Sequence, residues 1–107
     1  MRFLMTTKAS ETVPDESLFI EMAKFIEELT ATGALLATGG LEPGGTRLTS
    51  VNGELTVTDG PFAEAKEAIA GFALVETRSK EEAIELAGRF FKITGDGESL
   101  VQQVFTA

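Results

Sequence analysis

The clearest structural signal in the sequence is the stretch from Arg47 to Thr58, RLTSV-NG-ELTVT. Two runs rich in strand-forming residues flank Asn52-Gly53, the dipeptide that type I′ turns prefer, so the stretch predicts a β-hairpin with a two-residue loop. That loop length fixes the register and places Thr46 opposite Asp59. One hairpin face then carries a mostly apolar set: Leu48, Ser50, Leu55 and Val57. We expect this face to be the inner one, with Asp59 at its end.

Strand and helix patterns follow one another on both sides of the hairpin. Alternating or apolar runs predict strands over residues 2–8, 35–41, 71–76 and 100–105, and residues 63–70 are weakly helical. Apolar residues at helical spacing predict a helix that begins after Asp15 and ends at Gly33. A second helix begins at the capping box Ser79-Lys80-Glu81-Glu82. Its predicted apolar side consists of Ala83, Ile84, Ala87, Phe90 and Phe91.

This order of elements predicts a single α+β domain over residues 1–107. Strands of this number with two main helices favour one antiparallel sheet that the helices cover on one face, a ferredoxin-like arrangement. A single helix layer leaves the other sheet face bare. Because dimerisation sheet to sheet would bury that face, we expect a homodimer.

The composition argues against several classes of function. Seventeen acidic against nine basic residues give a formal net charge of −8, and this excess repels phosphate backbones, so nucleic-acid binding is disfavoured. The chain has no Cys and no His, which excludes disulfides, thiol nucleophiles, the usual zinc sites and histidine acid–base catalysis. No motif indicates a metal or another cofactor. No apolar run is long enough for a signal peptide or a membrane span, so we expect a cytoplasmic protein.

The run from Val57 to Glu67, VTDGPFAEAKE, resembles the DGPF branch of the YCII-related proteins. The likeness continues in Ile69–Phe72 and in shorter matches over nearly the whole chain. It implies a dimeric α+β barrel, in which two ferredoxin-like subunits pack sheet to sheet. It also implies a functional link to an extracytoplasmic-function sigma factor. A few relatives act on small aromatic or chlorinated ring compounds.

The sequence departs from this family pattern at several positions. YCII proteins proper are proposed to use a His–Asp pair, which a chain without histidine cannot form. The pattern has a glutamate at Gly39, and a glutamate and an arginine at Leu100 and Gln102. It also has a bulky aromatic residue at Ala73. Loss of both charge signs together resembles removal of an ion-paired cluster, which can be neutral for folding but not for charge chemistry.

Asp59 is the candidate catalytic residue. On the functional interpretation, its carboxylate lies at the mouth of a pocket between two sheets and acts as a base or as a ligand acceptor. On the structural interpretation, it accepts backbone N–H groups in a turn, and the following Gly60-Pro61 favours this second interpretation.

Three further residues complete the predicted ligand pocket: Ser50, Phe62 and Lys66. Ser50 either contacts a ligand or hydrogen-bonds to the backbone, and no base beside it is available for nucleophilic catalysis. Lys66 lies at the pocket entrance on the functional interpretation, although such charges more often belong to a solvated helix face. No residues are predicted to bind a metal.

The sequence favours one function over two others. The favoured one is a small-molecule-binding or accessory and regulatory dimer. The alternative is a weak or specialised enzyme that acts on a small ring-containing substrate with Asp59 as the acid–base group. The third is a purely structural interaction protein. The missing histidine and the missing charges at positions 39, 100 and 102 favour the first function over the second.

Overall fold

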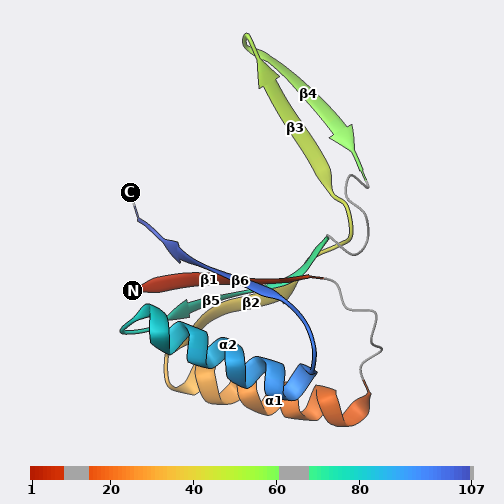
Figure 1. The fold of residues 1–107 in the computed structure, drawn as a ribbon. Coiled ribbons are helices and arrows are strands. Elements are labelled where there is room, and N and C mark those ends of the chain that lie inside the picture. Colours follow the sequence, from red (N-terminus) through yellow and green to blue (C-terminus); the bar gives the residue numbers. More distant parts are fainter. Residues whose placement is uncertain (9–14, 61–67, 107) are drawn as a thin grey trace.

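The computed structural model describes residues 1–8, 15–60 and 68–106. In chain order its elements are β1 (Arg2–Lys8), α1 (Glu16–Ala31), β2 (Leu35–Gly40), β3 (Thr46–Val51), β4 (Glu54–Asp59), β5 (Ile69–Glu76), α2 (Lys80–Thr94) and β6 (Ser99–Val104). Both helices cover one face of a four-stranded antiparallel sheet with the order β2-β5-β1-β6 (Figure 1). This is the predicted ferredoxin-like α+β fold, which is therefore confirmed. Of the predicted weak helix, residues 63–67 lie outside the described residues, and Ile69 and Ala70 at its end belong to strand β5 instead.

The hairpin forms a separate two-stranded sheet instead of joining the main one, which corrects the prediction of a single sheet. Its register is the predicted one, with Thr46 opposite Asp59 and Val51 opposite Glu54. Asn52 and Gly53 have φ values of 50° and 81°, as a type I′ turn requires. The hairpin rises from one end of the main sheet, on the side opposite the helices (Figure 1). The loop fixes how β3 and β4 pair, but no local signal ties the pair to the main sheet.

Both helices begin at the predicted caps. The Leu18 backbone N–H donates to the Asp15 carboxylate at 2.9 Å, and this hydrogen bond lowers the pKa of the Asp15 carboxyl. The Glu82 backbone N–H donates to the Ser79 hydroxyl oxygen at 3.1 Å. Gly33 follows the end of α1 with a φ of 81°. Within the described part of the chain, neither helix is long and apolar enough to cross a membrane.

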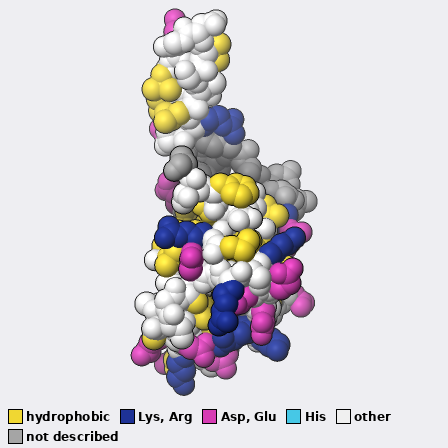
Figure 2. All heavy atoms as spheres, turned by 90° about the vertical axis from the view of Figure 1, so that its left-hand side faces the viewer, with side chains coloured by type: hydrophobic (Ala, Val, Ile, Leu, Met, Phe, Trp, Pro, Cys, Tyr) yellow, Lys and Arg dark blue, Asp and Glu magenta, His cyan; other side chains and the backbone are white. Residues whose placement is uncertain are grey.

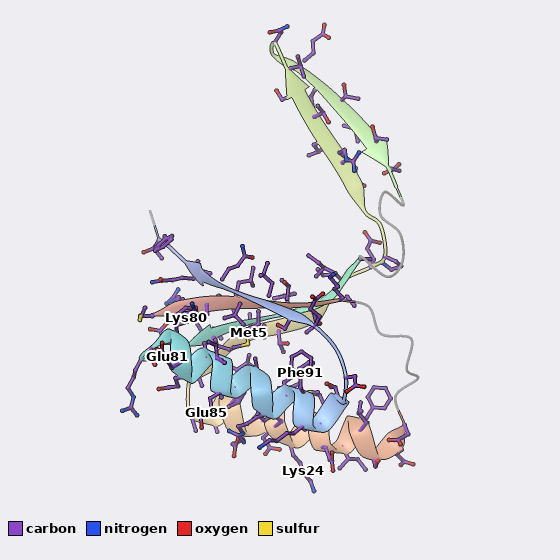
Figure 3. The ribbon with its side chains drawn as sticks, viewed as in Figure 1. Met5, Lys24, Lys80, Glu81, Glu85 and Phe91 are labelled. Atoms are coloured by element: carbon purple, nitrogen blue, oxygen red, sulfur yellow. The ribbon has the colours of Figure 1, made fainter. Side chains whose placement is uncertain are left out.

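The core lies between the helix layer and the sheet. Phe3 and Met5 alternate with more exposed residues along β1 and face the helices, and Figure 3 shows Met5 between the sheet and α2. Lys24, on α1, points away from the sheet (Figure 3). The buried apolar residues are Phe3, Met5, Leu29, Val75, Ala83 and Ala87.

The apolar side of α2 differs from the predicted one at a single position. Ala83 and Ala87 are buried as expected, and Phe90 is half-buried. Ile84 is 51% exposed, so its predicted place on the apolar side is wrong. The reason is geometrical, because residues 83, 87 and 90 follow the three- and four-residue spacing of one helix face, whereas Ile84 lies about 100° around the helix from Ala83.

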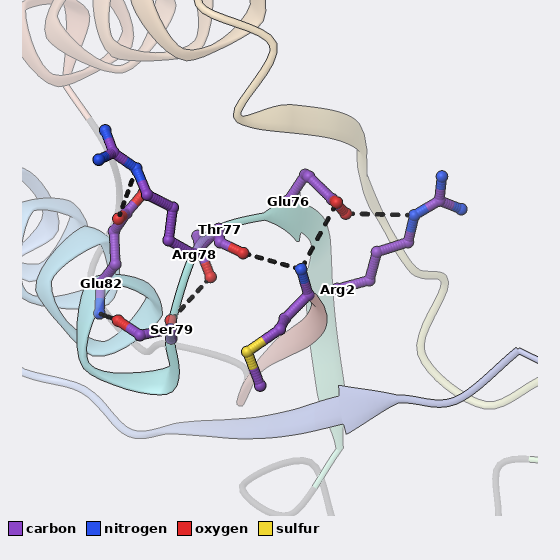
Figure 4. A network of polar contacts seen from close by, with 7 residues as sticks. Arg2, Glu76, Thr77, Arg78, Ser79 and Glu82 are labelled. Atoms are coloured by element: carbon purple, nitrogen blue, oxygen red, sulfur yellow. Dashed lines mark hydrogen bonds and ion pairs between the residues drawn. The ribbon is translucent and has the colours of Figure 1, made fainter.

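A polar network joins the start of the chain to the turn between β5 and α2 (Figure 4). The Met1 amino group donates to the Thr77 carbonyl oxygen at 2.9 Å, and Arg2 pairs with Glu76 at 3.2 Å. The buried Thr77 hydroxyl donates to the Ser79 carbonyl oxygen at 2.8 Å. Because its hydroxyl is satisfied, Thr77 can be buried at little cost.

Candidate functional site

A cavity of about 280 Å³ lies between the helix layer and the main sheet. Apolar side chains from α1, α2 and the sheet form most of its wall, among them Met5, Met22, Phe25, Ile26, Leu29, Leu35, Val75, Leu86 and Phe90. Because these residues belong to the amphipathic faces that build the core, the cavity is a gap in the packing between the helices and the sheet.

Small residues on the sheet side leave this space open. Ala73, on β5, is the register partner of Met5 and of Thr38, and it lines the cavity. Gly71 lines it one step further along the same face. A Cβ atom on Gly71 would lie 3.3 Å from the hydroxyl oxygen of Thr7. A larger side chain at either position would therefore take up part of the space.

Four hydroxyl groups lie toward the end of the cavity where β1 and β2 finish and β6 begins: Thr7, Thr38, Thr94 and Ser99. The Thr38 hydroxyl donates to the Phe72 carbonyl oxygen at 2.9 Å, so it has a protein partner. Thr7 and Ser99 are register partners on adjacent strands. Within the described residues, neither of these two hydroxyls has a hydrogen-bond partner in the protein. They are the groups best placed to bind a polar atom of a ligand.

Among the described residues, no titratable side chain lines this cavity. The lining can therefore hold an apolar ring and hydrogen-bond to a substituent, but it offers no acid or base for proton transfer. The described residues also contain no group of three or more acidic side chains placed to hold a metal ion.

A second cavity, of about 370 Å³, lies at the same end of the sheet and shares Thr7 and Ser99 with the first. Lys8 and Glu98 line it and form an ion pair at 2.7 Å. The hydrogen bond from Lys8 lowers the pKa of the Glu98 carboxyl. Because the two charges neutralise each other, this cavity is also a weak candidate for acid–base chemistry.

Neither cavity contains the predicted site residues that the structure describes. Ser50 and Asp59 lie on the hairpin and are exposed, and the Thr46 hydroxyl donates to the Asp59 carboxylate at 2.8 Å. Phe62 and Lys66 lie outside the described residues. A pocket between two subunits, where the sequence analysis placed Ser50 and Asp59, stays a prediction.

The predicted inner face of the hairpin is not covered within the chain. Leu48, Leu55 and Val57 share that face and are 62%, 64% and 59% exposed. The prediction was wrong for the single subunit because the hairpin stands clear of the sheet that was expected to cover it (Figure 1).

The positions where the family pattern carries charge share the uncovered sheet face, with Gly39 on the edge strand β2 and Leu100 and Gln102 on the opposite edge strand β6. Gly39 pairs with Phe72, Phe72 with Thr6, and Thr6 with Leu100, so these residues form one row across the four strands. Gln102 follows two residues after Leu100 and so shares its face. The Phe72 ring covers Gly39, where a Cβ atom would lie 3.1 Å from the ring. This row carries no charge.

Ion pairs lie at the two ends of β1 and not at its centre. Arg2 pairs with Glu76 at one end, and Lys8 pairs with Glu98 at the other. Between them, Leu4 and its register partner Leu74 are half-buried on the uncovered face. An uncharged centre with charges at its margins is the distribution found in protein–protein interfaces.

Residues 1–92 match the family of the YCII-related domain. The chain belongs to the YCII-related family. A stretch of 35 residues in this YCII-related protein is 51% identical to an uncharacterised protein of Rhizobium meliloti, and the match covers 33% of this chain and 28% of that protein. The chain therefore aligns with less than a third of that relative's length.

One solved structure has the same fold as this YCII-related protein. It is 5-chloro-2-hydroxyhydroquinone dehydrochlorinase (TftG) from Burkholderia phenoliruptrix, in complex with 2,5-dihydroxybenzoquinone. The two chains are 17% identical, the TM-score is 0.54, and the alignment covers 100% of this chain and 96% of TftG. At this identity the likeness establishes the fold.

The hydroxyl-lined end of the first cavity was not predicted from the sequence. One signal for it was present, because Thr7 is in phase with Phe3 and Met5 along β1 and thus shares their helix-facing side. Thr94 and Ser99 lie on separate elements, and only the packed fold brings them to the same end of the cavity.

Proposed function

We propose that this YCII-related protein is a homodimer that binds a small ring-containing molecule in the cavity between its helices and its sheet. The cavity itself carries this proposal, because it combines apolar walls with hydroxyl groups at one end. Ligand pockets commonly have volumes of roughly 300–1,000 Å³. At about 280 Å³ this cavity is just below that range, which favours a ligand with one ring.

The relative of known structure supports this ligand class. The TftG structure contains 2,5-dihydroxybenzoquinone, a planar ring that carries oxygen substituents. A ring of this kind suits the apolar walls of the cavity, and an oxygen substituent suits the Thr7 and Ser99 hydroxyls. Backbone and hydroxyl groups of this kind commonly orient ligands in otherwise apolar pockets.

The residues that line the cavity favour binding over catalysis. A general acid or base must lie within hydrogen-bond reach of the proton it transfers, and the described lining contains no titratable side chain. We therefore assign an accessory or regulatory role, in which the bound molecule is sensed or carried. A functional link to an extracytoplasmic-function sigma factor and a cytoplasmic location stay part of this proposal.

The uncovered sheet face supports the dimer. Its central row runs from Gly39 to Leu100 without a charged side chain, and Leu100 is 58% exposed. Packing two such faces together would remove apolar surface from water at roughly 25 cal/mol per Å². Two chains that each carry a formal charge of −8 need an uncharged contact of this kind.

Absorbance titration with 2,5-dihydroxybenzoquinone tests the ligand proposal. The chain has no Trp and no Tyr, so protein absorption contributes little background in the near ultraviolet. We expect saturable binding with one site per subunit. Thr7→Val keeps the side-chain shape but removes the hydroxyl, and we expect it to weaken binding about tenfold. Linear, unsaturable absorbance changes with the wild type would contradict the assignment to this ligand class.

A cavity-filling variant tests the location of the site. Ala73→Phe places a bulky ring in the cavity, at the position where the family pattern has an aromatic residue, and we expect it to abolish binding while the chain stays folded. Ala31→Phe makes the same change at an exposed position on α1 and should leave binding unchanged. Wild-type affinity in Ala73→Phe would place the ligand elsewhere.

The alternative, an enzyme that uses Asp59 as its acid–base group, is kept because TftG is a dehydrochlorinase. Asp59 does not line either described cavity, so this function needs a ligand site between two subunits. We expect no catalysed chloride release from 5-chloro-2-hydroxyhydroquinone. Release that Asp59→Asn abolishes would favour the enzyme over the binding protein.

A further inference from the structure

The hairpin carries an apolar face that nothing in the chain covers. Its exposed members Leu48, Leu55 and Val57 share this face with Ser50. No residue of β3 or β4 is buried or even half-buried. An isolated two-stranded hairpin is marginally stable in water, so a hairpin with this much apolar exposure requires support from another surface.

The accessible surface of the chain is also larger than expected for a compact chain of this mass. A compact chain of 11.4 kDa exposes about 5,800 Å² and has a radius of gyration of about 13 Å. This chain exposes 7942 Å² and has a radius of gyration of 16.0 Å. The excess of roughly 2,000 Å² is more than the ~800 Å² that each partner buries in an interface of standard size. This excess area is large enough to contain an interface of standard size.

The position of the hairpin relative to the uncovered sheet face favours a second copy of the chain as the partner. The hairpin rises from the end of the main sheet on its uncovered side, so hairpin and uncovered face form a corner (Figure 1). A second sheet packed on that face would lie ~10 Å away. Each hairpin strand has six residues and spans about 20 Å, so it would reach past that second sheet. A second copy seated on the uncovered face would therefore lie beside the hairpin.

The charge distribution agrees with a second copy as the occupant. Figure 2 shows most charged side chains over the sheet and helices, while the hairpin shows hydrophobic side chains together with a few charged ones at its tip and base. The apolar face of the hairpin, with Leu48, Leu55 and Val57, carries one charged side chain, Asp59, at its base end. Because two copies with a formal charge of −8 repel each other, contact is favoured where charge is absent.

We propose that the apolar face of the hairpin is a dimerisation arm, which packs against the flank of a second copy seated on the uncovered sheet face. In a two-fold symmetric dimer, the hairpin of each subunit then contacts the other subunit. This inference rests on the proposed dimer and adds a second contact region to it, separate from the sheet.

Sedimentation equilibrium of matched variants tests the arm. Leu48→Asn with Leu55→Asn makes the apolar face polar, and we expect the dimer dissociation constant to rise by about 100-fold. Thr49→Asn with Thr56→Asn changes a register pair on the opposite hairpin face and should shift it less than about threefold. Equal dissociation constants for the two double variants would overturn the arm.

Two outcomes separate the arm from the dimer itself. Leu100→Arg places a charge at the centre of the uncovered face and should dissociate the dimer. A wild-type chain that is monomeric would overturn both the arm and the dimer. A dimer that Leu100→Arg dissociates but the Leu48 and Leu55 double variant leaves intact would overturn the arm alone.

Thiol labelling gives a second test that does not depend on leucine substitutions. The chain has no cysteine, so Ser50→Cys on the apolar face and Thr49→Cys on the opposite face each carry a single thiol. We expect iodoacetamide to modify the Ser50→Cys dimer more slowly than Thr49→Cys, and Leu100→Arg to remove the difference. The same rate for both thiols in the dimer would contradict the arm.

Discussion

The helix-facing side of the main sheet and the apolar face of the hairpin follow the same alternation of apolar and polar residues, yet they differ in burial. On β1, Phe3 and Met5 are buried under the helices, whereas Leu55 and Val57 on β4 are about 60% exposed. An alternating pattern therefore identifies the residues that share a face, but it does not identify what covers that face. The main sheet is covered by the two helices of the same chain. For the hairpin, we propose that the covering layer is a second copy of the chain.

The largest expected difference between the two regions is in the cost of losing a large apolar side chain. Phe3→Ala should lower the free energy of unfolding by roughly 3–5 kcal/mol, because it leaves a cavity in the core. Leu55→Ala, measured below the dimer dissociation constant, should change it by less than about 0.5 kcal/mol. Urea unfolding followed by circular dichroism gives both values, and similar losses would show that the hairpin packs within its own chain.

The next largest effect is expected at Gly53 in the hairpin turn. Gly53→Ala should destabilise the turn by roughly 1–2 kcal/mol, because its φ of 81° is costly for a residue with a Cβ atom. Amide hydrogen exchange of the hairpin strands measures this local cost. Exchange rates unchanged from the wild type would contradict the left-handed conformation at this position.

A glycine-to-alanine change in helix α2 should have the opposite effect on stability. Gly88 lies in the middle of α2, is exposed, and has no atom within 4 Å of the Cβ position. Gly88→Ala should raise the free energy of unfolding by roughly 0.5–1 kcal/mol, because alanine has the higher helix propensity. Urea melts of the variant and the wild type measure the gain, and a loss of stability would show that α2 packs more tightly at this position.

The smallest expected effect concerns the ion pair between Lys8 and Glu98. The pKa of Glu98 is lowered in the folded state, so its contribution to stability is present above the unfolded pKa near 4.5 and is lost as the pH falls through the folded value. Glu98→Gln should therefore be slightly less stable than the wild type at pH 7 and equal to it at low pH. Because Glu98 is exposed, added salt should also reduce the difference. Urea melts at pH 7 and pH 3 check this.

Much of the fold followed from local signals in the sequence. Asn52-Gly53 determined the hairpin register, and Asp15 and Ser79 marked the starts of both helices, because each depends on residues within one turn. The separation of the hairpin from the main sheet did not follow from the sequence. Ile84 was misplaced for a related reason, since packing against the sheet selects which part of an apolar helix side is buried.

The candidate site was less predictable than the fold. Asp59 stands in a recognisable motif, but the motif does not show whether its carboxylate faces a ligand, and in one chain it is exposed beside Thr46. The cavity depends on the absence of a side chain at Gly71 and on the small side chain of Ala73. A gap of this kind appears only when the helices are packed on the sheet, so no run of residues could have indicated its shape.

Sedimentation equilibrium of the wild-type chain at micromolar concentration tests the central claim, that a second copy covers the uncovered sheet face. We expect one species with a mass near twice 11.4 kDa. We also expect Leu100→Arg to convert this species to a monomer, because the charge would be buried without a partner at the centre of the interface. A wild-type species of 11.4 kDa at every concentration tested would contradict the claim.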